Sequence, residues 1–177
     1  MDLATTYLQS ASKRVAYYKA LGDKTFAQLS ETDFHFSPNN ECNSIAVLIQ
    51  HLAGNMLSRW TDFLTSDGEK EGRDRDTEFE EQSLGKQQLI ELWEKGWACF
   101  LTALQQLSAD DLLRNITIRQ ESLTVVDAIN RQLAHYPHHV GQIIYVAKII
   151  KEAQWQTLSI AKGSSHQYNQ QLIPKKQ

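Results

Sequence analysis

Two histidines, His135 and His139, stand four residues apart in an apolar stretch that reads as one long helix. Residues with this spacing lie one turn apart on the same helical face, so their two imidazoles can bind one metal ion. Zinc proteases that use this spacing carry a glutamate directly after the first histidine, and Tyr136 holds that place here. The pair therefore indicates a metal site but not a zinc protease, with ordinary hydrogen-bonded or solvated histidines as the alternative.

The helical register separates this pair from the neighbouring His138. Relative to Ile129 on the apolar face, His135 and His139 lie about 120° and about 80° to one side, whereas His138 points nearly opposite. We therefore expect His138 to face solvent. A further histidine, His51, lies at the margin of another apolar stripe, where it could face either a groove or water.

Four long helical patterns must position these residues. Apolar side chains recur at helical spacing over residues 3–29, 44–64, 85–107 and 124–150, and Gly22 with Asp23 could break the first pattern in two. Residues 116–118 are β-like but short, which predicts a connection or a two-stranded embellishment. Residues from about 155 to 177 read as an irregular tail. The chain is therefore expected to form one all-α domain over residues 1–177, an antiparallel four-helix bundle.

The connection between the second and third helical patterns contains a strongly acidic segment, residues 67–81. It holds eight acidic and three basic residues, a local charge of -5 against -3 for the whole chain. The favoured interpretation is a solvated loop, because runs of charge usually face water. The alternative is a lid or specificity loop, since long loops in compact domains are often functional.

Composition excludes several classes of protein. The 177 residues are 41% hydrophobic and 22% charged, as in ordinary globular domains, and a net charge of -3 without a basic stripe argues against a nucleic-acid partner. The N-terminus has no basic region followed by an apolar stretch, and no run approaches the roughly 18 apolar residues of a membrane span. We expect a cytoplasmic protein that has no membrane partner.

Taken together, these motifs carry a resemblance to a known superfamily. His135-x-x-x-His139 is followed by Gly141 and Gln142, and His51 stands alone in the second helical pattern. With the order of the helices and the long excursion between the second and third, this pattern resembles the DinB-like superfamily of four-helix bundles, which includes the YfiT-type thiol transferases. The Lys-Gly-Ser-Ser-x-x-Tyr-Asn segment at residues 162–169 is similar to the tail of an uncharacterised subgroup.

The resemblance implies a metal site and an activity. It makes His51 the third ligand beside His135 and His139, for a divalent ion such as Zn²⁺ or Ni²⁺ with one open position. It also implies a homodimer and the metal-dependent transfer of a low-molecular-weight thiol, held as thiolate, to an electrophile. No catalytic residue is identified. Many relatives carry Arg directly after the second motif histidine, and Val140 stands there in this chain. The resemblance is therefore weaker support for assigning any particular substrate of those relatives to this chain.

Other side chains could support the ligands. Asn55 and Gln132 could each hydrogen-bond a ligand imidazole or bound water. For Gln142 a packing or surface role is favoured, although its place in the motif also allows it to support a ligand. Three alternatives to a transferase remain open: a binding or stress-response bundle with a structural metal, a metal-dependent hydrolase that activates water, and an interaction module.

Overall fold

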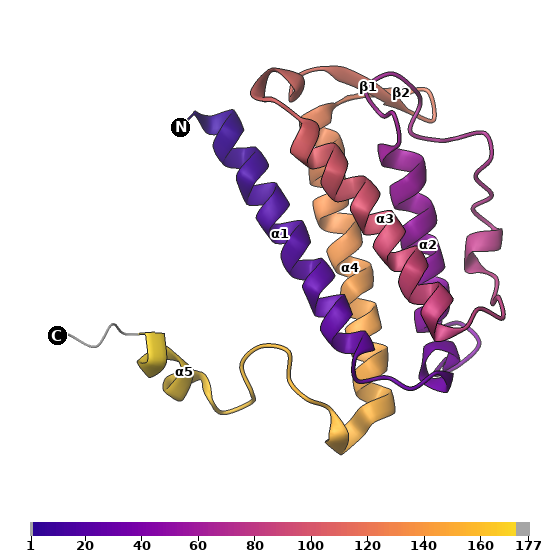
Figure 1. Ribbon diagram of the computed structural model, residues 1–177, viewed down its shortest axis with the longest axis vertical. Coiled ribbons are helices and arrows are strands. Elements are labelled where there is room, and N and C mark those ends of the chain that lie inside the picture. Colours follow the sequence, from indigo (N-terminus) through magenta and orange to yellow (C-terminus); the bar gives the residue numbers. More distant parts are fainter. Residues whose placement is uncertain (1, 173–177) are drawn as a thin grey trace.

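The computed structural model describes residues 2–172, and four long helices form its body (Figure 1). They are α1 (Leu3–Phe26), α2 (Ile45–Trp60), α3 (Lys86–Gln106) and α4 (Val125–Lys151). Helix α2 packs mainly against α3, and α1 packs mainly against α4. The expected all-α bundle is confirmed, and the helix bounds lie within a few residues of those predicted from periodicity.

The predicted break in the first helix is wrong, because α1 continues through Gly22 without interruption. A Cβ atom at Gly22 would lie 2.3 Å from Cζ2 of Trp93, so the glycine allows the indole of α3 to pack against the backbone of α1. The Trp93 indole also donates a hydrogen bond from Nε1 to Oδ1 of Asp23 at 2.8 Å. This glycine therefore serves a close helix–helix contact rather than a turn.

Helices α2 and α3 run in the same direction, which corrects the prediction of a fully antiparallel bundle (Figure 1). Gly96 lies against Ala53, and one turn further along both helices the Cys99 thiol lies 3.8 Å from the carbonyl oxygen of Met56. The connection over residues 61–85 runs back along the bundle and returns the chain to the end at which α2 begins. Such a crossover needs a connection that can span the length of α2, roughly 24 Å for a 16-residue helix. Residues 61–85 are long enough to do so.

A short antiparallel hairpin, β1 (Asn115–Ile118) and β2 (Glu121–Thr124), precedes α4 and confirms the predicted two-stranded embellishment. Its turn residues, Arg119 and Gln120, have φ angles of 56° and 64°, a region that side-chain-bearing residues rarely adopt. Both backbone N–H groups donate to the carboxylate of Asp67 at 2.9 Å. Asp67 thereby ties the hairpin turn to the start of the acidic segment.

The chain after α4 is more regular than expected. A short helix, α5 (Ser165–Leu172), occupies part of the predicted irregular tail, and residues 173–177 of that tail lie outside the described part of the chain. Before α5, the backbone N–H of Gln156 donates to the side chain of Gln28 at 2.8 Å, which attaches the tail to the end of α1. Over the described residues, no helix is long and apolar enough to cross a membrane.

Candidate metal centre

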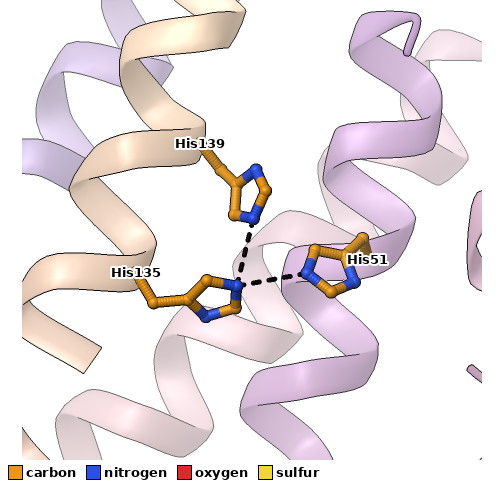
Figure 2. A group of neighbouring side chains, drawn as sticks. All are labelled: His51, His135 and His139. Atoms are coloured by element: carbon orange, nitrogen blue, oxygen red, sulfur yellow. Dashed lines mark hydrogen bonds between the residues drawn. The ribbon is translucent and has the colours of Figure 1, made fainter. Parts of the chain in front are cut away.

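Three histidines meet between α2 and α4 (Figure 2). His135 and His139 lie one turn apart on α4, and His51 faces them from α2. The Nε2 atoms of His135 and His139 are 3.0 Å apart, and those of His135 and His51 are 3.3 Å apart. His51 is buried, whereas the other two are partly exposed. Helical geometry and packing thus bring together residues that are 84 positions apart in the sequence.

Each of the three imidazoles is oriented by a side-chain oxygen at its outer nitrogen. Nδ1 of His51 lies 3.0 Å from Oε2 of Glu78, and Nδ1 of His139 lies 2.7 Å from Oε1 of Gln142. Nδ1 of His135 lies 3.3 Å from Oε1 of Gln132. An oxygen acceptor at each Nδ1 requires the proton there, so each Nε2 presents a lone pair toward the other two.

The separations of the Nε2 atoms fit a shared ion. Two nitrogen ligands at the Zn–N distance of about 2.0–2.1 Å on a tetrahedral ion are about 3.3 Å apart. The candidate ligand atoms of His51, His135 and His139 all lie within 4.8 Å of one another. The three-histidine group can therefore hold a metal ion with only small adjustments.

Electrostatics keep the imidazoles of His135 and His139 uncharged near neutral pH. Burial, with added effects from the positive charges of His139 and His51, lowers the pKa of His135 to about 3. Burial also lowers the pKa of His139, although its hydrogen bond to Gln142 opposes that shift. Because metal ligation requires neutral imidazole, protons do not compete with a cation for these two residues at pH 7.

Part of the acidic segment 67–81 lies against this site, although most residues of the segment are exposed to solvent as a solvated loop would be. The side chains of Arg73 and Glu78 are 4% and 9% exposed, and Nε of Arg73 donates to Oε1 of Glu78 at 2.7 Å. The ring of Phe79 packs on the His51 imidazole with 4.6 Å between ring centroids. A Cβ atom at Gly54 would lie 2.2 Å from Oε1 of Glu78, so α2 leaves room there for the carboxylate.

Glu78 is a residue of the candidate site that the sequence did not indicate. Burial alone would raise the pKa of this carboxyl, but hydrogen bonds from Arg73 and His51 outweigh burial and hold the pKa below its ordinary value. Glu78 is therefore ionised where it meets His51, as in the carboxylate–histidine pairs that support metal ligands. Glu78 is one of eight acidic residues in its segment, and no spacing in the sequence distinguishes it from the others.

The structure separates the three predicted supporting residues. Gln132 and Gln142 hydrogen-bond the imidazoles of the candidate ligands His135 and His139, and Gln142 does so from an exposed position. Asn55 has a different partner: its Oδ1 accepts a hydrogen bond of 3.1 Å from the hydroxyl of Tyr136. His138 is exposed, as its register predicted.

Fold and site together define a helical bundle with a three-histidine group that can hold a metal ion. The chain belongs to the family described as Protein of unknown function (DUF1572), whose family model matches residues 2–164. That range contains the four long helices, the acidic segment and every residue of the candidate metal centre. No curated protein and no solved structure matches the chain.

Proposed function

We propose that the protein binds one divalent metal ion through Nε2 of His51, His135 and His139. One observation carries this proposal: every Nδ1 is paired with a side-chain oxygen, so three Nε2 lone pairs face one another. Lone pairs in such contact repel unless a cation lies between them. A helix-packing role for the histidines would not require all three tautomers to be set in this way.

The ligand set favours Zn²⁺ or Ni²⁺. Imidazole nitrogens suit these borderline ions, whereas Mg²⁺ and Ca²⁺ prefer oxygen ligands. Within the described residues the group has three members, and the nearest carboxylate, Glu78, is engaged by Arg73. Three protein ligands leave a coordination position free for a small molecule, which is the arrangement of catalytic rather than structural sites.

The activity that we propose is transfer of a low-molecular-weight thiol to an electrophile. The DinB-like pattern of His51, His135, His139 and Gln142 supports it, since that superfamily includes thiol transferases. A divalent ion bound here would lower the pKa of a coordinating thiol and so supply sulfur in its nucleophilic form. The thiol proton leaves to solvent, the sulfur bonds to the electrophilic carbon, and the leaving group departs with its electron pair.

The chain's own residues prepare the site for that step. Glu78, Gln132 and Gln142 hold the three rings in one tautomer and orientation, so ligand geometry is set before anything binds. Phe79 and the buried wall of α2 keep water from the His51 side of the group. His135 and His139 are partly exposed, which leaves a path for a small molecule.

Metal analysis of protein purified without a histidine tag tests the binding step. We expect close to one divalent ion per chain after reconstitution with Zn²⁺ or Ni²⁺. His139→Ala should abolish binding, whereas His138→Ala, which alters the exposed neighbour on the same helix, should retain it. A reconstituted wild type without metal would overturn the proposal, and so would an unchanged stoichiometry in His139→Ala.

A second experiment tests the chemistry. The metal-loaded protein is mixed with a panel of thiols and an alkylating electrophile, and adduct formation is followed by mass spectrometry. We expect adduct above the background rate with at least one thiol, lost on chelation and lost in His139→Ala. A metal-loaded protein that is silent with every thiol of the panel would instead favour a non-catalytic metal-binding bundle.

A further inference from the structure

A small cavity of about 170 Å³ opens beside the three-histidine group. His51 and His135 form part of its wall. Four arginines line the remainder with Asn55 and Gln132, and no aspartate or glutamate side chain lines it within the described part of the chain. The arginines are Arg59 from α2, Arg75 from the acidic segment, Arg119 from the hairpin turn and Arg131 from α4.

The charges around this cavity do not balance. Arg59 and Arg119 share a single carboxylate oxygen, Oε2 of Glu69, at 2.8 Å and 2.9 Å. Neither Arg75 nor Arg131 forms an ion pair with any described residue, although both line the cavity. A cleft lined by charges of one sign raises the local concentration of counter-ions, and guanidinium groups are the side chains best suited to bind oxyanions.

Two of the four arginines are held in place by the fold. Arg59 is 4% exposed, and its guanidinium is fixed by the carbonyl oxygen of Gly68 as well as by Glu69. Arg119 occupies the unfavourable positive-φ position of the hairpin turn, which the carboxylate of Asp67 stabilises. Strained backbone of this kind persists where surrounding contacts enforce it, and it is concentrated at functional sites.

We propose that this arginine cavity binds an oxyanion group, a carboxylate or a phosphate, of the molecule that reacts at the three-histidine group. The inference rests on the proposed function in assigning that anion to the substrate, because the cavity shares His51 and His135 with the metal centre. The bound group orients the remainder of the molecule toward the three Nε2 atoms. Carboxylate and phosphate both match the guanidinium fork, so the shared feature is the oxyanion itself.

The volume limits what the cavity accepts. About 170 Å³ corresponds to roughly five or six water molecules, enough for one oxyanion group and a short chain. A nucleotide or a folded partner would not enter. The recognised molecule is therefore a small acid whose reactive end lies at the His51 and His135 side of the cavity.

Anion titrations of the metal-free protein test this site separately from the metal. Isothermal titration calorimetry at low salt is performed with inorganic phosphate and, separately, with succinate. We expect the wild type to bind at least one of them, and Arg75→Gln/Arg131→Gln to bind it at least about tenfold more weakly. Arg14→Gln, which removes an exposed arginine of α1 outside the cavity lining, should bind as the wild type does.

The outcomes separate the two proposals. Binding of phosphate alone indicates a phosphoryl group, binding of succinate alone indicates a carboxylate, and binding of both supports the shared oxyanion site. Absence of binding to metal-free and metal-loaded wild type, or equal binding by the double variant, overturns the anion site while leaving the metal proposal intact. Anion binding by a protein that takes up no metal would retain this site and overturn the proposed function.

Discussion

Oε2 of Glu78 accepts a hydrogen bond from the Nδ1–H of His51 at 3.0 Å, across 27 residues of sequence. Glu78 comes from the crossover connection and His51 from α2, so this contact joins the acidic segment to the candidate metal centre. Two hydrogen bonds from Arg73, of 2.7 Å and 2.8 Å, hold the same carboxylate. The segment between α2 and α3 therefore acts on His51 directly, although it supplies none of the three candidate ligands.

Glu78→Gln should weaken metal binding by about 10–100-fold. The amide carries no charge to stabilise His51 when the ring binds a cation, although its carbonyl oxygen could still accept the Nδ1–H. Competition titration against a chromogenic chelator measures the change in affinity. Glu80→Gln is the control, because Glu80 is exposed in the same segment. Equal metal affinities in wild type and Glu78→Gln would show that Glu78 serves only to pack the acidic segment against α2.

Gly54→Ala should also weaken metal binding, by displacing Glu78 without altering any polar group. The new methyl group would lie 2.2 Å from Oε1 and 2.8 Å from Cδ of Glu78, so the carboxylate has to move away from His51. Chelator competition compares this variant with Gly141→Ala on α4, where an added Cβ has no neighbour within 4 Å. Gly141→Ala should retain affinity and gain up to about 1 kcal/mol of helix stability. Unchanged affinity in Gly54→Ala would mean that the carboxylate position is unimportant.

Tyr136→Phe should destabilise the fold and leave metal affinity close to that of the wild type. Nε1–H of Trp60 donates to the Tyr136 hydroxyl, which donates to Asn55, both at 3.1 Å within the core. Removing the hydroxyl leaves a buried donor and a buried acceptor unpaired, at a cost of about 1–3 kcal/mol. Urea denaturation measures this loss against Tyr145→Phe, whose side chain is 68% exposed. A large fall in metal affinity with unchanged stability would instead indicate that Asn55 supports the metal ligands, as the sequence predicted.

Periodicity and spacing predicted the parts of the fold and site that are local in sequence. The helix bounds follow from apolar recurrence at 3.6 residues, and the same geometry places His135 beside His139 and turns His138 outward. Adding His51 required the family resemblance, because no local rule relates a residue of α2 to one of α4. Where one helix carries two candidate ligands, the helical register alone predicts that they lie side by side.

The missed features all depend on contacts between distant segments. Gly22 looked like a break because its partner, Trp93, is far along the chain. The direction of α3 was mispredicted because residues 61–85 are long enough either to reverse the chain direction or to cross back and place α3 parallel to α2. Glu78 was hidden among eight acidic residues, since only its three-dimensional neighbours Arg73 and His51 distinguish it. Composition described this segment as polar but could not show which side chains are buried.

The metal-free protein should lose stability as the pH falls from about 6.5 toward about 3. His135 has a pKa of about 3 in the folded chain against 6.5 as its ordinary value, so the unfolded chain binds more protons throughout that interval. The free energy of unfolding therefore rises with pH across it. The lowered pKa of His139 acts in the same direction.

Urea denaturation with chelator present, at several pH values from 4 to 7.5, measures this slope. His135→Gln removes the main titrating group, so its stability should depend less steeply on pH than that of the wild type. His138→Gln, at the exposed neighbouring position, should retain the wild-type slope. Parallel slopes for wild type and His135→Gln would show that the imidazole is accessible to protons in the folded protein, and that the site does not keep its ligands neutral.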